Sequence, residues 1–185
     1  MVVFRHERKR SFLLHITEEQ RVSRYETGAA RKARATTLQL RMVQFESNHS
    51  WITHIHREIH VLMNELMREG WAGTKSDVFD TLKQKHSHTV GLFEPETGRL
   101  VGMATVAILR TFHGVEARID NVVILKEYRE QGEGERLMRY VLSLAKAHHA
   151  EWAELVCGRE RLPARELYRK VGFEESQGTV FTKML

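Results

Sequence analysis

The sequence predicts an α/β protein in which a mixed sheet is flanked by helices. Residues 119–145 read as a strand, a turn with two spaced glycines, and a helix with apolar residues every three or four positions. Residues 50–69 show the same helical periodicity. Residues 88–93 and 99–110 are two β-rich runs separated by a short segment of turn-forming residues. Together these patterns indicate a sheet whose strands are connected by helices and a hairpin.

The N-terminal half is expected to contribute one strand and two helices. Apolar and polar residues alternate over residues 37–43, which predicts a first strand. The helix over residues 50–69 is expected to end at Gly70, a favourable C-cap. Ser76 is expected to cap a second helix that runs to about His86.

The C-terminal half continues the alternation of strands and helices. Turns are predicted at residues 94–98 and 112–114, and the second leads into a strand over residues 115–125. The remaining elements are a helix to about His149, a strand at 155–157, a helix from about Pro163 to Gly172, and last strands at Phe173 and 180–184. The predicted order is therefore β-α-α-β-β-β-α-β-α-β.

Length and composition indicate one cytoplasmic domain with an N-terminal extension. A chain of 185 residues is long enough for one domain with a sizeable core. Its single cysteine, Cys157, cannot form an internal disulfide, which fits a reducing compartment. No apolar run approaches the roughly 18 residues of a membrane span, so no membrane contact is expected. We expect residues 1–36 to form a basic extension and residues 37–185 to form the domain.

The excess of positive charge lies in the N-terminal arm. Residues 1–41 hold 10 Lys/Arg against 4 Asp/Glu, whereas residues 42–185 hold 19 against 20. A solvated extension is the favoured interpretation. Contact with nucleic acid is less favoured, because the arm lacks interleaved aromatic residues for base stacking. Subunit contacts within a homodimer are the third interpretation.

The glycine turn has the features of an anion site. A helix N-terminus exposes backbone N–H groups and the positive end of the macrodipole, so it can hold a phosphate or pyrophosphate. Gly132 and Gly134 let the backbone approach such a group without an intervening Cβ.

Two motifs resemble those of the GNAT superfamily of N-acetyltransferases. The first follows the hydrophobic strand and reads Arg129-x-x-Gly132-x-Gly134. The second is a helix that carries Tyr168 and closes on a Gly-Phe pair. The motifs stand in the family's order and separation and cover most of residues 115 to 175. The resemblance implies the GNAT acyl-CoA N-acyltransferase fold and an enzyme that moves an acetyl group from acetyl-CoA to a primary amine in a ternary complex.

The resemblance also implies where the co-substrate acetyl-CoA binds. The strand backbone would pair with the pantetheine arm like an added strand, and the glycine turn would wrap the pyrophosphate. The implied cofactor-binding residues are Val122, Val123, Ile124, Arg129, Glu130, Gln131, Gly132, Glu133, Gly134 and Glu135. Glu130 departs from the family, which often has a glycine there. Together with Glu133 and Glu135 it brings negative charge to an anion site, so a weaker or altered cofactor preference is left open.

Two carboxylates are candidates for the general base. An alkyl ammonium with a pKa near 10 must lose a proton before it can attack a thioester. If alternation holds, Glu116, Arg118 and Asp120 share one face of the strand. Asp120 is the first candidate, acting directly or through a water molecule, and Glu116 is the second. The alternative is a solvent-facing or salt-bridged role for each. A backbone N–H near Val122 or Val123 could stabilise the oxyanion.

Tyr168 is the candidate acid. It matches the tyrosine of the family's second motif, whose hydroxyl would reach the coenzyme sulfur, and the alternative is aromatic packing. Cys157 could suggest a nucleophile, but it follows Leu155 and Val156 in an apolar run and is interpreted as core.

A histidine cluster raises the question of a metal. His56 and His60 have the i, i+4 spacing of metal ligands, and His54 lies on the same helix. Neither the zinc-protease order nor a completing group of carboxylates or cysteines is present. A polar helix face is therefore favoured, and no metal is expected.

The acceptor is the least determined part of the prediction. Residues 69–86 usually shape the acceptor pocket in this family, and here they offer no obvious anionic trap for a polycation. A small-molecule amine is favoured. The alternatives are a protein amine, the aminoacyl group of a charged tRNA, or a non-catalytic nucleic-acid-binding protein that keeps the fold.

Overall fold

The computed structural model describes residues 41–45, 49–67 and 70–184. The predicted basic extension, residues 1–36, lies outside the described residues, as do residues 37–40 of the first predicted strand.

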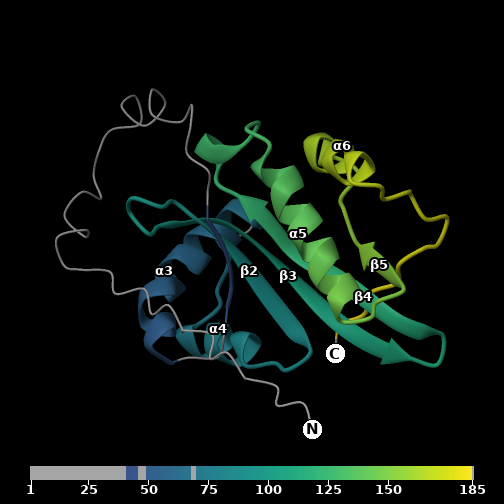
Figure 1. Cartoon of the computed structure of the whole chain (residues 1–185), viewed down its shortest axis with the longest axis horizontal. Helices are drawn as coiled ribbons and strands as arrows, with labels where there is room; N and C mark the ends of the chain where they lie inside the picture. The colour runs from purple at the N-terminus through teal and green to yellow at the C-terminus, as the bar shows by residue number, and fades with distance from the viewer. Residues whose placement is uncertain (1–40, 46–48, 68–69, 185) are drawn as a thin grey trace, which may run out of the picture.

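The described elements alternate as the sequence predicted over most of the chain (Figure 1). They are β1 (Arg41–Gln44), α3 (His49–Leu66), α4 (Lys75–Leu82), β2 (Ser87–Phe93), β3 (Leu100–Thr111), β4 (Gly114–Ile124), the 3-10 turn η1 (Lys126–Tyr128), α5 (Glu133–Ala147), β5 (Trp152–Leu155) and α6 (Leu162–Lys170).

The strands of the described residues form one mixed sheet. Its order is β1-β2-β3-β4-β5, with antiparallel pairs from β1 to β4 and a parallel pair between β4 and β5. In Figure 1, α3 and α4 lie on the left, α5 crosses the view between β3 and β5, and α6 lies at the upper right. The predicted mixed sheet flanked by helices is therefore confirmed.

Helices cover both faces of the sheet. Residues 89–93 of β2 and 100–106 of β3 are all buried, although consecutive residues of a strand point to opposite faces. The cover comes from α3, which packs against β3 and β4, and from α5, which packs against β2 and β3. Both helices form because their apolar residues recur every three or four positions and bury one stripe, which includes Ile59 and Leu62 in α3 and Leu137 and Val141 in α5.

None of the helices in the described ranges combines the length and the apolar character needed to cross a lipid bilayer.

β4 changes its pairing near its C-terminal end. Met103 of β3 faces Val123, whereas Thr105 faces Asp120, so β4 carries one extra residue in a β-bulge. Asn121 sits in this bulge with φ of 54°, a left-handed conformation that Asn tolerates better than most residues. The parallel pairing with β5 ends at Ile119. The last residues of β4 therefore continue without β5 as a neighbour.

Several details of the sequence prediction are wrong, among them the end of the second helix, which lies at Leu82 and not at about His86. The second helix is capped by Thr74, not Ser76. The Thr74 side chain accepts a hydrogen bond from the Asp77 N–H, and the Asp77 carboxylate accepts one from the Thr74 N–H. The strand expected at 155–157 lies at Trp152–Leu155, because these residues pair with β4. Neither Phe173 nor residues 180–184 form a strand, and Val180, Phe181 and Met184 are exposed, so no neighbouring strand in the described ranges covers them.

His88, near the start of β2, contacts the C-terminal end of α5. Its ring stacks on His148 with centroids 4.3 Å apart, and its Nδ1 accepts a hydrogen bond from Gln44 Nε2 at 3.0 Å. Burial lowers the pKa of His88 below the usual 6.5, and repulsion from His148 and His86 lowers it further. The folded protein therefore holds His88 neutral at a pH where the unfolded chain already binds a proton.

This linkage predicts a pH dependence of stability. Because the folded pKa of His88 is depressed, the contribution is present above about pH 6.5 and is lost as the pH falls below the unfolded value. We expect the free energy of unfolding to fall between about pH 7 and pH 5 more steeply in the wild type than in His88→Gln. Urea denaturation at several pH values measures both slopes, and parallel slopes would contradict the prediction.

Candidate active site

A cavity of about 900 Å³ opens beside the part of β4 that β5 no longer accompanies. Its lining combines residues 122–124 of β4, the turn before α5, α6 with the two residues before it, and residues 65–67 at the end of α3. In Figure 1, α6 lies beside the upper end of α5, and the two helices are in contact. The cavity therefore brings together the strand, the glycine turn and the Tyr168 helix that the sequence singled out separately.

The glycine turn leads directly into the N-terminus of α5. Gly132 is the N-cap residue with φ of 82°, a left-handed conformation that glycine adopts without strain. A Cβ built on Gly134 would lie 3.1 Å from Leu167 Cδ2, so this glycine permits the close approach of α5 and α6. The first N–H groups of a helix have no partner within the helix. The end of α5 thus offers hydrogen-bond donors at the cavity.

The two glutamates at the start of α5 are already paired with cations. Glu133 is bound by Arg136 at 2.7 Å, and Glu135 is bound by Arg139 at 2.8 Å and by Lys170 at 2.6 Å. Hydrogen bonds from Lys170 and then Arg139 hold the pKa of Glu135 below its usual value. These ion pairs offset much of the negative charge that the sequence places next to the turn.

Two arginines reach across the cavity to the end of α3. Arg129 donates through Nη2 to Glu65 at 2.7 Å and through Nε to the Ile124 carbonyl oxygen at 2.8 Å. Arg161, just before α6, donates to the carbonyl oxygen of Leu66. A diphosphate bound at the turn would therefore compete with Glu65 for the guanidinium of Arg129.

Tyr168 lines the cavity from α6. Its ring packs edge-on against Phe173, with centroids 6.1 Å apart. Burial raises the pKa of its hydroxyl to about 12, the nearby Cys157 adds to the rise, and Arg161 opposes it. The hydroxyl is therefore protonated at any working pH and can donate a hydrogen bond.

Cys157 lies just past β5 and is half-buried. Burial raises the pKa of its thiol above the usual value. Because the thiolate is the nucleophile, a raised pKa opposes a covalent role for this residue. Cys157 is close enough to Tyr168 to contribute to the raised pKa of the tyrosine hydroxyl. It lies after the end of β5 at Leu155, whereas the sequence predicted it inside that strand.

The candidate bases lie on one face of β4, as alternation predicted. Val115, Ala117 and Ile119 are buried on the opposite face. Glu116 pairs with Arg118 at 3.6 Å, and Asp120 is exposed immediately before the bulge. Neither carboxylate lines the cavity. Glu116 is therefore engaged in an ion pair, whereas Asp120 lies two residues before Val122, the first residue of β4 that lines the cavity.

His60 of α3 contacts side chains outside the histidine cluster. His60 Nδ1 lies 2.7 Å from Asn64 Nδ2, and its ring contacts Trp71 edge-on. The rings of His56 and His60 are 6.3 Å apart. Among the described residues, no group of three or more His, Cys, Asp or Glu side chains is arranged to hold a metal ion.

Residues 48–173 match the model of the acetyltransferase (GNAT) family. The chain belongs to this family. The predicted family and fold class are therefore confirmed, and GNAT proteins are acyl-CoA-dependent N-acetyltransferases.

Individual relatives agree with this assignment. The uncharacterized N-acetyltransferase YobR of Bacillus subtilis (strain 168) is 32% identical over 74 residues, which span 40% of this chain and 28% of YobR. The glucosamine-6-phosphate N-acetyltransferase of Arabidopsis thaliana has a TM-score of 0.64 at 16% identity, over 78% of this chain and 98% of its own. The aminoglycoside N-acetyltransferase AAC(6')-Iy in complex with CoA has a TM-score of 0.65 at 13% identity, over 80% of this chain and 96% of its own. At these identities the solved structures show the fold.

Glu130 is the position at which this GNAT chain departs from the expected glycine. It lines the cavity with φ of 61°, which is uncommon for a residue with a side chain. The left-handed conformation costs about 1–2 kcal/mol for such a residue, and glycine recovers most of it despite losing about 0.5–1 kcal/mol to greater freedom in the unfolded chain. The backbone conformation therefore explains why a glycine suits this position.

We expect Glu130→Gly to raise both stability and affinity for coenzyme A. The dissociation constant should fall by about 3-fold, because a carboxylate near the phosphates is worth a few tenths of a kcal/mol to about 1 kcal/mol in solvent. Calorimetric titration and thermal melting measure the two effects. His149→Gly is the matched control, since His149 has φ of 64° at the far end of α5. Equal affinity in both variants would contradict the prediction.

Sequence reasoning missed Glu65 and Arg161 as cavity residues. Their contacts, Glu65 with Arg129 and Arg161 with Leu66, join residues 64 and 95 positions apart. Neither residue belongs to a motif, and no local pattern marks such a contact. Only the packing of α3 against the sheet brings these partners together.

Proposed function

We propose that the protein transfers an acetyl group from acetyl-CoA to a primary amine by direct attack in a ternary complex. The observation that carries the proposal is the convergence of three features on one cavity. These are the stretch of β4 not accompanied by β5, the N-terminus of α5 and the residue Tyr168. An acyl-CoA substrate needs an extended site for its pantetheine arm, donors for its diphosphate and a polar group near its sulfur. Each requirement has a counterpart here.

Acetyl-CoA would supply the acetyl thioester, and this chain's residues would bind and orient it. The backbone of residues 122–124 offers an edge for an extended ligand. The turn from Arg129 to Glu135, Gln131 included, offers N–H groups at a helix N-terminus for the diphosphate. The open space around Gly132, where an added Cβ would meet no atom within 4 Å, supports this fit.

The remaining chemistry requires a proton acceptor for the amine and a donor near the sulfur. Asp120 is the proposed base, acting through a water molecule, because it is exposed and precedes the bulge that borders the cavity. Glu116 is the second candidate, because it is already engaged in an ion pair with Arg118. Tyr168 is the proposed donor. Proximity of the amine and the thioester supplies much of the rate.

The acceptor we propose is a small-molecule amine. The cavity lining carries more Glu than Arg and Lys, which favours an acceptor that arrives as an ammonium. The glutamates are Glu65, Glu130, Glu135, Glu160 and Glu166, and the cations are Arg129, Arg161 and Lys170. The named substrates of the two structural neighbours, an aminoglycoside and glucosamine-6-phosphate, are also amines of small molecules.

Thiol release from acetyl-CoA across a panel of amines tests the proposal. The panel contains amino sugars and polyamines, peptides with free amines, and aminoacylated tRNA. Turnover with the first group alone supports it, whereas turnover with peptides or tRNA moves the acceptor to the alternatives. Failure of the folded protein to bind coenzyme A or to release thiol with any acceptor refutes it. Salt-sensitive nucleic-acid binding that requires residues 1–36 would then favour the non-catalytic alternative.

The division into a basic extension at residues 1–36 and a domain at residues 37–185 stays part of this proposal. So do a homodimer and a cytoplasmic location. Sedimentation of the full chain and of a chain lacking residues 1–36 distinguishes a domain that stands alone from one that needs the extension.

A further inference from the structure

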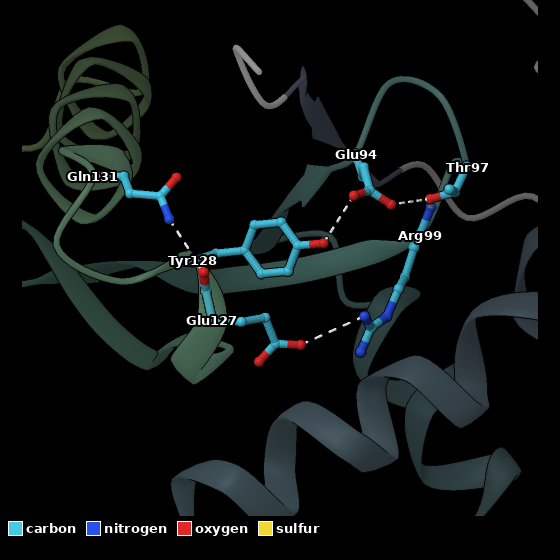
Figure 2. A network of polar contacts seen from close by, with 6 residues as sticks. All are labelled: Glu94, Thr97, Arg99, Glu127, Tyr128 and Gln131. Atoms are coloured by element: carbon cyan, nitrogen blue, oxygen red, sulfur yellow. Dashed lines mark hydrogen bonds and ion pairs between the residues drawn. The ribbon is translucent and has the colours of Figure 1, made fainter. Parts of the chain in front are cut away.

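The hairpin turn between β2 and β3 contains a buried carboxylate. Glu94 is 7% exposed, and its backbone closes the turn by accepting a hydrogen bond from the Gly98 N–H and by donating one to the Arg99 carbonyl oxygen, both at 2.9 Å. Its side-chain oxygen Oε2 accepts a hydrogen bond from Thr97 in the same turn (Figure 2). A carboxylate buried in this way needs partners for both oxygens, because an unsatisfied one costs about 1–3 kcal/mol.

The second oxygen of Glu94 binds a residue from a distant part of the chain. The Tyr128 hydroxyl donates to Oε1 at 2.9 Å, and Tyr128 is itself only 8% exposed. Figure 2 shows the tyrosine ring pointing from the ribbon of η1 to the hairpin turn, where Glu94 and Thr97 lie. Tyr128 is the last residue of η1 and directly precedes Arg129. The contact therefore fastens the start of the glycine turn to a rigid hairpin.

Two weaker contacts tie the same segment. Arg99 of the hairpin lies 3.5 Å from Glu127, and Gln131 donates to the Glu127 carbonyl oxygen at 3.1 Å. Both pairs are at the surface, where an ion pair contributes little. The buried Tyr128–Glu94 bond is the strong member of this set, because desolvation makes a charge-assisted hydrogen bond both stronger and costlier to lose.

We propose that Tyr128 and Glu94 are positioning residues for the diphosphate of the coenzyme. The inference rests on the proposed function, since it assumes that the glycine turn holds that group. The turn contains two left-handed residues within three positions, Glu130 and Gly132. A backbone of this shape presents its N–H groups to one point only if its ends are fixed. α5 fixes the C-terminal end, and the Tyr128–Glu94 bond fixes the N-terminal end.

The position of these residues predicts which kinetic constant they control. Neither side chain lines the cavity, so neither contacts the reacting atoms. A loosened turn must be ordered again when the ligand binds, which weakens binding. Once the ligand is bound, Tyr168 and β4 are unchanged. Loss of the bond should therefore raise KM for acetyl-CoA and leave kcat nearly unchanged.

Tyr128→Phe removes the hydroxyl while keeping the ring. We expect the dissociation constant for coenzyme A, measured by calorimetric titration, to rise by about 5-fold, the equivalent of a typical intramolecular hydrogen bond. We also expect faster hydrogen exchange of the amides of residues 126–134 in the ligand-free protein. The exchange measurement reports on the turn without coenzyme.

Thr97→Val is the matched control. It removes the other hydrogen bond of the same carboxylate, together with the bond that the Thr97 hydroxyl accepts from the Arg99 N–H, so it should lower the melting temperature by at least a similar amount. Because Thr97 belongs to the hairpin, coenzyme affinity and amide exchange at the turn should stay as in the wild type. Glu94→Gln is the conservative rescue: its amide can still accept from Tyr128 and donate to Thr97, so affinity should stay within about 2-fold of the wild type.

The outcomes separate the two proposals. One outcome is that Tyr128→Phe lowers the melting temperature as Thr97→Val does, while coenzyme A affinity and amide exchange of the turn stay as in the wild type. In that case the bond is merely structural and the inference is wrong. If the wild type itself fails to bind coenzyme A, the proposed function is wrong. The positioning of the turn is then decided by exchange alone, and unchanged exchange in Tyr128→Phe overturns it as well.

Discussion

Replacing Tyr168 with Phe is expected to lower kcat about 10²-fold and to leave the dissociation constant for coenzyme A unchanged. Tyr168 lines the cavity, and the pKa of about 12 keeps its hydroxyl protonated throughout the working range. That pKa lies above the value of about 8.5 for a thiol, so complete proton transfer to a thiolate is uphill. The residue should therefore act by donating a hydrogen bond to the sulfur as negative charge develops there. Such a bond is made more strongly in the transition state than before it.

The raised pKa of Tyr168 also predicts how activity depends on pH. No loss of activity above neutral pH should be traceable to its ionisation until well above the usual pKa of 10, because burial raises the value in the folded protein. Tyr140→Phe on α5 serves as the control, since Tyr140 is half-buried and lies outside the cavity lining. Steady-state kinetics with saturating acetyl-CoA measures kcat. An unchanged kcat in Tyr168→Phe would assign the ring to packing against Phe173.

Gly132→Val is expected to reduce coenzyme affinity by at least 10-fold. A β-branched residue with φ near 82° is strongly disfavoured, so the N-cap of α5 must shift. The new side chain would also stand where the diphosphate approaches the backbone. We expect a loss of about 2 kcal/mol in stability from the backbone alone. Calorimetric titration with coenzyme A measures the loss of affinity.

Gly172→Val separates strain from the loss of binding. Gly172 ends α6 with φ of 97°, and, as at Gly132, an added Cβ would meet nothing within 4 Å. Both variants should therefore lose similar stability in thermal melting. Gly172→Val should keep most of its coenzyme affinity because it lies outside the cavity lining. Equal loss of affinity in both variants would show that general destabilisation, not the turn, is responsible.

The sequence predicted best those parts of the site that are continuous in the chain. β4, the glycine turn and α5 follow one another, so their order and periodicity were enough to place Gly132 and Gly134 before a helix. The capping residue of α4 also had a local signal, because Thr74-x-x-Asp77 has the spacing of a capping box. Ser76 has a competing local signal, because Asp77 and Asp80 would then lie in the first turn of the helix.

Other parts depend on partners that the sequence does not identify. β5 lies at Trp152–Leu155 because those residues meet β4, and a short apolar run does not fix its own register. Residues 180–184 have the alternation of a strand, yet β-propensity mainly reflects packing against neighbours, and in the described structure these residues are exposed. The Tyr128–Glu94 bond joins residues 34 positions apart, and neither side chain marks the other in the sequence.

The change in the pairing of β4 divides one strand into two regions with different evolutionary freedom. Up to Ile119 its backbone is committed to neighbours on both sides, so a change there is felt by the whole sheet. Past Ile119 the side that faced β5 is released, and the extra residue at Asn121 changes the register with β3. Selection on ligand recognition can then reshape the last few positions without dismantling the scaffold. A strand that outruns one of its neighbours thus keeps an adaptable end.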